Sequence, residues 1–224
     1  GGIVFECFRS PRKEARILAL VDGHPNFMHG LTVPDDHGNL VRVMDYIFGA
    51  SLAARVADIG QDHERYFFET LPGIISNYLR CAEAVRFLHE HGEKHGDIRR
   101  DHILIDADSG DYRWIDFDYN YRHRENIYGY DLFGLGNVLI YVVGKGDVLL
   151  PELRRSAPGV LARLTDADLN IVFHNRVANL QKIFPYIPDS LNRVLLHFSR
   201  GANWFYEHTT QLIQDLQQAA ADIR

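Results

Sequence analysis

The spacing of apolar residues changes along the chain, from short strand-like runs near the start to helical patterns further on. Before Gly49, runs rich in branched and aromatic residues predict strands at 3–8, 27–33 and 40–46, and Ser10-Pro11 predicts the start of one helix. Beyond Gly49, apolar residues recur every three or four positions, which is typical of helices. The predicted helical segments are 51–70, which is broken, and 74–90, 131–143, 151–164, 169–183, 190–198 and 209–223. The pattern predicts a mixed α+β chain.

A predicted hairpin interrupts the helical part. Residues 103–105 and 112–115 are rich in branched and aromatic side chains, and the D-S-G-D sequence between them is a turn signal. Asp97 comes just before the first of these strands and Asp116 just after the second. Because a hairpin folds the chain back on itself, we expect the two carboxylates to lie side by side. Such a pair suits a general base beside a metal ligand.

Glu14 stands on the apolar face of the first predicted helix. Ile17, Leu18 and Val21 follow it at helical spacing, so its carboxylate faces the core. A carboxylate in that position needs a partner. Alternatively, Glu14 lies only one turn into the helix and interacts favourably with the helix N-terminus. The local sequence supports both interpretations.

Composition places the chain among ordinary globular proteins. It has 224 residues, 46% of them apolar, and a formal charge of -6, enough for one large domain or two small lobes. A nucleic-acid binder would carry a basic face, so we expect no nucleic-acid partner. Cys7 and Cys81 have no metal-ligand spacing, which favours a reducing, cytoplasmic compartment. The strongest apolar run, 138–143, is too short to span a membrane, and the start of the chain lacks a signal-peptide pattern, so we expect no membrane partner.

The order of motifs resembles the protein kinase superfamily over residues 3–216. Residues 95–102, H-G-D-I-R-R-D-H, resemble the catalytic loop H-R-D-L-K-x-x-x-N, in the H-G-D form shared with aminoglycoside kinases. The D-F-D at 116–118 resembles the metal-binding D-F-G. The other motifs that resemble kinase segments are Glu14 with the H-P-N at 24–26, the hinge at Tyr46-Ile47, the D-L-F-G-L-G at 131–136, and the closing helices at 187–216.

This resemblance implies a protein-kinase-like two-lobed fold, with a truncated small lobe at 1–48 and a mostly helical large lobe at 49–224. The implied activity is transfer of a phosphoryl group from ATP to a hydroxyl, with Ser or Thr of a protein as the expected acceptor. The implied cofactors are ATP and Mg or Mn. The resemblance also assigns roles to residues: Asp97 as catalytic base, Arg99 as the cation that neutralises phosphate charge, Asp116 and His102 at the metal, and Glu14, Asp45, Tyr46 and Ile47 at the nucleotide.

The small lobe departs from the kinase pattern. No Gly-rich loop is present, and Gly1-Gly2 is either its last remnant or unrelated to it. The nucleotide-orienting Lys should fall near Glu6, where no Lys stands. Lys13 is the nearest, but it neighbours Glu14 in sequence and therefore points to another face. Glu14 thus lacks its expected partner.

The large lobe departs at three points. His102 replaces an Asn that helps to hold the second metal; it either favours manganese as a nitrogen ligand or hydrogen-bonds across the loop, to Asp97 or Asp116. The passage from Asp116 to Asp131 is too short for an ordinary activation segment and has no A-P-E. Phe205 stands where the partner Arg of that motif is expected.

Three functional hypotheses follow. The first is an ATP-dependent phosphotransferase of protein-kinase type, favoured by the retention of Asp97 and Asp116. The second is a pseudokinase that acts as a nucleotide-binding or protein-interaction module, favoured by the loss of the Gly-rich loop and the Lys. The third is a kinase for a small-molecule hydroxyl substrate, suggested by H-G-D, although the region around Tyr206 is more similar to Ser/Thr kinases.

Overall fold

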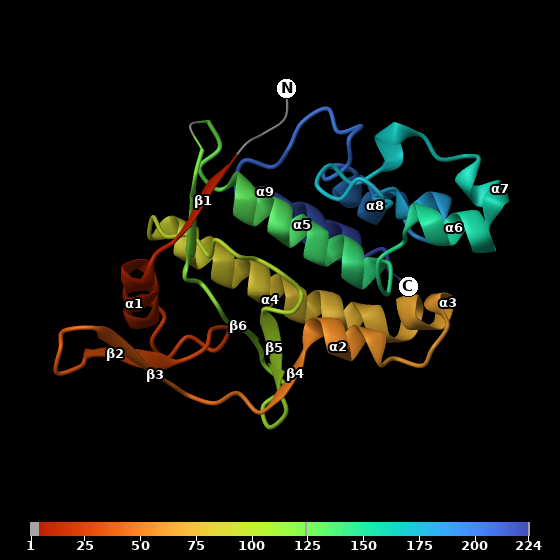
Figure 1. Cartoon of the computed structure of the whole chain (residues 1–224). Helices are drawn as coiled ribbons and strands as arrows, with labels where there is room; N and C mark the ends of the chain where they lie inside the picture. The colour runs from red at the N-terminus through yellow and green to blue at the C-terminus, as the bar shows by residue number, and fades with distance from the viewer. Residues whose placement is uncertain (1–4, 124, 224) are drawn as a thin grey trace.

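The computed structural model describes residues 5–123 and 125–223 and shows small sheets beside a larger helical body (Figure 1). The first part contains β1 (Glu6–Arg9), α1 (Pro11–Leu20), β2 (Gly30–Pro34) and β3 (Leu40–Met44). β2 and β3 form an antiparallel hairpin, and α1 packs against β2. Residues 3 and 4 of the predicted first strand, and Gly1-Gly2, lie outside the described residues.

The helix α1 forms where the cap signal predicts it. The Ser10 hydroxyl accepts a hydrogen bond from the backbone N–H of Lys13 at 3.3 Å, as expected of an N-cap residue. Ile17, Leu18 and Val21 are buried and form the apolar face of the helix. Glu14 is also buried, as its position on that face predicts.

The predicted hairpin is present and forms part of a three-stranded antiparallel sheet. β4 (Gly49–Ser51) pairs with β5 (Ile103–Asp106), which pairs with β6 (Tyr112–Trp114). The H-P-N segment joins the first part to this sheet. The Trp114 N–H donates to the Asn26 carbonyl at 2.9 Å, and the Met28 N–H donates to the Trp114 carbonyl at 2.8 Å.

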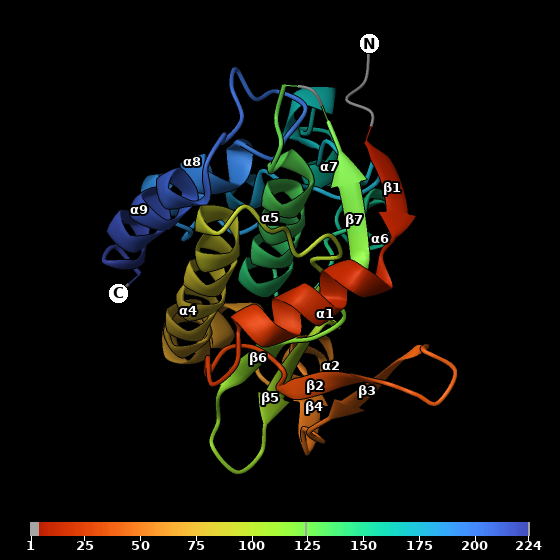
Figure 2. The same ribbon diagram turned by 90° about the vertical axis from the view of Figure 1, so that its left-hand side faces the viewer.

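Helices make up most of the second part. They are α2 (Leu52–Ala57), α3 (His63–Arg65), the π-helical turn η1 (Tyr66–Thr70), α4 (Leu71–Glu90), α5 (Gly129–Val143), α6 (Leu150–Ser156), α7 (Pro158–Leu161), the 3-10 turns η2 (Asp166–Asp168) and η3 (Leu180–Lys182), α8 (Asp189–Leu196) and α9 (Thr209–Ala220). α5 packs against α4 and α8, and α9 packs against the same two helices (Figure 2).

The core is centred on α5, whose apolar side chains are buried on several faces. Leu135, Leu139 and Val142 are fully buried. Gly136 allows the Phe198 ring to lie directly against the helix, since a Cβ at this position would collide with the ring. Among the described residues, no helix combines the length and the apolar character needed to cross a membrane.

Several sequence predictions are wrong in detail. The Tyr-rich passage after D-F-D contains an additional strand, β7 (Tyr119–Arg122), which pairs antiparallel with β1. The hinge strand is absent, because β3 ends at Met44 and residues 45–48 form an irregular connection. The segment 151–164 is divided at Ala157 into α6 and α7.

The predicted helix at 169–183 is also wrong, because most of this segment is irregular. Side chains in this segment form hydrogen bonds with nearby backbone N–H groups, which are then not available for helical hydrogen bonds. The Asn170 Oδ1 accepts from the N–H groups of Val172 and Phe173, at 2.9 and 2.7 Å. Such local bonds compete with helical hydrogen bonding.

Candidate active site

The H-G-D loop connects α4 to β5 and is anchored on Asp131 of α5. The fully buried Asp131 carboxylate accepts hydrogen bonds from the backbone N–H groups of His95 and Gly96, both at 2.8 Å, and from His89 Nε2 at 3.0 Å. Burial alone would raise the pKa of Asp131, but these hydrogen bonds outweigh it and keep the pKa below its ordinary value. The central helix therefore fixes the backbone of the loop.

The loop passes so close to β7 that position 96 requires glycine. Gly96 has a φ of 89°, in the left-handed region that favours glycine. A Cβ there would collide with the Tyr119 carbonyl oxygen. His95 precedes it, fully buried, and its ring packs edge-on against Trp114 and Phe117, with centroid distances of 4.9 and 5.9 Å. His95 thus packs as a structural residue against the D-F-D segment.

Asp97 and Asp116 lie on opposite sides of the His102 ring. His102 Nδ1 is 2.9 Å from the Asp97 carbonyl oxygen and 3.5 Å from its Oδ2, and His102 Nε2 is 3.7 Å from Asp116 Oδ2. Because a carbonyl only accepts hydrogen bonds, Nδ1 is the donor. His102 therefore bonds across the loop, as one of the two sequence interpretations expects.

The two carboxylates differ in environment. Burial raises the pKa of Asp97, and the nearby His102 opposes this effect. The Asp116 side chain is 61% exposed, and its backbone has a φ of 56°, which is uncommon for a residue other than glycine. Asp97 is thus partly buried with a raised pKa, whereas Asp116 is open to an incoming group.

Lys13 holds the two motif loops together. Its buried ammonium group donates to the carbonyl oxygens of His95, at 2.7 Å, of Phe117, at 2.9 Å, and of Tyr119. Burial lowers the pKa of Lys13 to about 8. Lys13 does point away from Glu14, as its sequence position predicts, but its role as a clamp was not foreseen.

Glu14 has a partner in Arg42 of β3, with which it forms an ion pair. This favours the interpretation in which its carboxylate needs a partner, and the partner is an arginine on a later strand rather than a lysine on the first one. Asp45, Tyr46 and Ile47 follow β3 in the irregular connection. The Asp45 N–H donates to the His29 carbonyl at 3.0 Å, and Tyr46 is 87% exposed.

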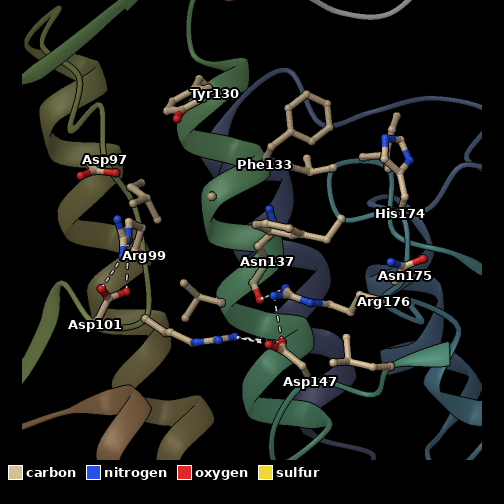
Figure 3. A pocket seen from close by; sticks show the side chains of 18 of the residues that line it. Asp97, Arg99, Asp101, Tyr130, Phe133, Asn137, Asp147, His174, Asn175 and Arg176 are labelled. Atoms are coloured by element: carbon tan, nitrogen blue, oxygen red, sulfur yellow. Dashed lines mark hydrogen bonds and ion pairs between the residues drawn. The ribbon is translucent and has the colours of Figure 1, made fainter. Parts of the chain in front are cut away.

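A groove of about 1350 Å³ begins at Asp97 and extends along α5. In Figure 3, Asp97 and Arg99 lie on one side, His174 and Arg176 on the other, and Tyr130, Phe133 and Asn137 of α5 lie between them. Arg99 is more than half exposed, and its guanidinium is paired with Asp101 at 2.6 Å. Arg100 forms an ion pair with Asp147 at 2.9 Å.

Compared with known structures, this arrangement is that of the protein kinase fold. The kinase domain of Mycobacterium tuberculosis PknI, in two double-mutant forms, superimposes with TM-scores of 0.62 and 0.61 over 93% of this chain and 77% of that domain, at 16 and 14% sequence identity. The chain therefore has a divergent protein-kinase-like fold, with the α+β two-lobed architecture that its motifs imply.

Sequence comparison agrees with this class. The chain is 29% identical over 120 residues to the putative ribosomal protein S6 kinase alpha-2 of Caenorhabditis elegans, covering 52% of this chain and 15% of that protein. It is 32% identical over 104 residues to protein kinase C epsilon type of Rattus norvegicus, covering 46% and 13%. The matches thus span about half of the chain and a small part of each relative. No protein-family model matches the sequence.

Proposed function

We propose that the chain is an ATP-dependent phosphotransferase of protein-kinase type, which transfers the terminal phosphoryl group of ATP to a hydroxyl of a protein Ser or Thr. The observation that carries this proposal is Asp97, a partly buried carboxylate with a raised pKa at the end of a large groove. It accepts the proton of the substrate hydroxyl and aligns the oxygen for attack. Arg99 neutralises charge on the transferred group.

Asp116 and His102 are the side chains suited to hold the divalent ion that protein kinases use with ATP. His102 Nδ1 bonds to a carbonyl, which leaves Nε2 facing Asp116, and metal-binding histidines are usually oriented by such a bond. The described residues contain no cluster of three or more metal-ligating side chains. The remaining ligands are therefore nucleotide phosphates and water, as is usual for magnesium sites. The ion neutralises phosphate charge when bound.

The nucleotide contacts come from the small lobe and the connection after it. Asp45, Tyr46 and Ile47 stand where the first part passes into the second, and we assign them to the base of ATP. Glu14 acts through Arg42, which it holds in an ion pair at the junction of α1 and β3. Arg42 thereby supplies the cation that Glu14 would otherwise share with a lysine.

One specific observation favours the pseudokinase alternative. The Lys13 ammonium is committed to three backbone carbonyls and cannot orient ATP phosphates without breaking that clamp. A module that retains the fold and binds nucleotide weakly, or acts through protein contacts, is consistent with this arrangement.

Thermal shift and phosphate transfer from labelled ATP separate the two functions, with magnesium and with manganese. Substituting Asp97→Asn removes the proton acceptor and should lower transfer by a factor of roughly 10² or more. Asp108→Asn, in the exposed turn between β5 and β6, is the matched control and should leave transfer unchanged. Stabilisation by nucleotide without transfer would favour the pseudokinase. If nucleotide causes neither phosphate transfer nor thermal stabilisation, the enzyme function is ruled out.

A further inference from the structure

The end of the groove away from Asp97 contains two guanidinium groups and one carboxylate. Arg100 Nη1 donates to both carboxylate oxygens of Asp147 at 2.9 Å, and Arg176 Nη2 donates to Oδ1 at 2.8 Å. All three residues line the groove, and Asp147 and Arg176 are labelled in Figure 3. The cluster therefore has a net charge of +1, because one carboxylate is shared between two permanent cations.

Arg176 retains unused hydrogen-bonding capacity in this cluster. Its side chain is only 7% exposed, and its Nε has no hydrogen-bond partner. Burial lowers the pKa of Arg176 and the neighbouring Arg100 adds to this effect, while Asp147 only partly offsets them. A buried guanidinium with an unsatisfied donor and excess positive charge around it favours an additional anion.

The surrounding side chains hold both guanidinium groups in fixed planes. The Arg100 guanidinium lies 4.1 Å from the centre of the Tyr141 ring, and the Arg176 guanidinium lies 4.3 Å from that of Phe173. Stacking of this kind orients an arginine for bidentate binding of a carboxylate. The cluster is thus preorganised for an anionic group.

The groove combines this cationic cluster with a carboxylate at its other end. Asp97 stands at the catalytic end, near Tyr130 and Phe133 of α5, and Asn137 of the same helix lies between this end and Asp147 (Figure 3). A ligand that matches the groove has a hydroxyl at one end, an apolar or neutral middle and a negative group at the other end. The volume of about 1350 Å³ exceeds what a single small metabolite fills.

We propose that this groove selects an acidic segment of a protein substrate, with its Ser or Thr hydroxyl at Asp97 and an Asp or Glu side chain at Arg100 and Arg176. This specificity rests on the proposed phosphotransferase function. The carboxylate balances the net charge of the cluster. Asp147 acts as the resident competitor of the incoming carboxylate.

Calorimetric titration without nucleotide tests the binding preference directly. Three ten-residue peptides are compared, each with a central Ala in place of the acceptor and with Glu, Gln or Lys in the flanking positions. We expect the Glu peptide to bind at least tenfold more tightly than the Gln peptide, and the Lys peptide to bind most weakly. Equal affinities for the Glu and Gln peptides would overturn the proposal.

Two variants with opposite expected effects separate recognition from structural support. Arg100→Gln should weaken binding of the Glu peptide at least fivefold, whereas Asp147→Asn should strengthen it severalfold by removing the competing carboxylate. Arg193→Gln removes the same charge from an exposed position on α8 and should change affinity less than twofold. Weaker binding in both Arg100→Gln and Asp147→Asn would indicate a merely structural cluster and overturn the proposal.

A small anion is the alternative source of the negative group. Binding of 3-phosphoglycerate that depends on Arg100, without binding of the Glu peptide, would overturn the assignment to a protein segment. Because no nucleotide is present, the outcome is independent of catalysis. Phosphate transfer without acidic preference would reject this inference alone, whereas acidic preference without transfer would reject only the phosphotransferase function.

Discussion

At the scale of single residues, the ammonium group of Lys13 links three segments that are far apart in sequence. It connects α1 to the H-G-D loop through His95 and to the D-F-D segment through Phe117 and Tyr119. Its neighbour Glu14 bonds to Arg42 on another face of the same helix. One turn of α1 therefore supports both the motif loops and the β2–β3 hairpin.

These residue-level results show what motif order could and could not predict. Asp97 and Asp116 were recognised because each stands in a short motif beside a predictable hairpin. The partnership of Lys13 with carbonyl groups 82 to 106 positions away leaves no local signal. Arg42 was likewise overlooked, because the alternating pattern of its strand does not indicate which face meets α1.

A further residue-scale prediction concerns the choice of metal at His102. Nucleotide should bind more tightly with manganese than with magnesium, because the Nε2 facing Asp116 is a nitrogen donor that manganese accepts more readily. His102→Asn should reverse this order. Calorimetric titration of a non-hydrolysable ATP analogue in the presence of each ion measures the two nucleotide affinities. His91→Asn, at an exposed position, is the control. Equal or tighter magnesium binding in the unmodified protein would contradict the prediction.

At the scale of elements, the pairing of β1 with β7 is the main departure from what the sequence predicts. The motif order placed the first strand beside the small-lobe strands, but β1 instead pairs with the strand that follows D-F-D. Strand pairing is decided by long-range contacts, whereas strand existence is a local property. Tyr119–Arg122 was not predicted as a strand, because this strand is only four residues long and largely polar.

The close approach of β7 to the H-G-D loop leads to a prediction at Gly96. Gly96→Ala should destabilise the protein and displace β7, since its Cβ would collide with the Tyr119 carbonyl oxygen. The cost should exceed that of Gly92→Ala, where φ is also positive, at 72°, but where no atom lies near the added Cβ. Strain alone costs about 1–3 kcal/mol.

Urea unfolding of both glycine variants measures this difference, and phosphate transfer by the same proteins reports on the loop. Gly92→Ala should lose stability only, whereas Gly96→Ala should lose both stability and transfer. Equal losses of stability in the two variants would show that the contact with β7 adds nothing to the effect of the backbone conformation.

At the scale of the whole molecule, the helical body was predicted better than the small sheets. α4, α5, α8 and α9 follow clear three- and four-residue apolar spacings and appear close to their expected positions. The segment 169–183 shows the limit of that pattern. It has suitable apolar spacing, but its short polar side chains stabilise turns instead.

The stability of the whole molecule should depend on pH through His95. Burial lowers the pKa of His95 to about 3, from a model-compound value of 6.5. Between these values the unfolded chain binds a proton that the folded protein does not, so unfolding becomes easier as pH falls. The contribution is roughly 1.4 kcal/mol per pH unit within this window.

Denaturant unfolding at several pH values between 4 and 7 tests this dependence. His95→Phe should show a smaller loss of stability on acidification than the unmodified protein, while His91→Phe, at an exposed position, should keep the full loss. The contributions of the other titrating groups to the pH dependence of stability are common to all three proteins and therefore cancel in the comparison. Parallel curves for the unmodified protein and His95→Phe would contradict the assignment.

The surroundings of β7 restrict how any protein can dock beside the H-G-D loop. β1 occupies one edge of β7, and on β7 itself the Tyr119 and Tyr121 carbonyls accept hydrogen bonds from Lys13 and Lys94. The backbone of β7 therefore has few free hydrogen-bonding groups with which an incoming strand could pair. A protein segment that reaches Asp97 therefore gains little affinity from pairing with β7, and we expect its side chains to provide most of the affinity. Selectivity then depends on the chemistry of the flanking residues, not on the ability of the segment to become a strand.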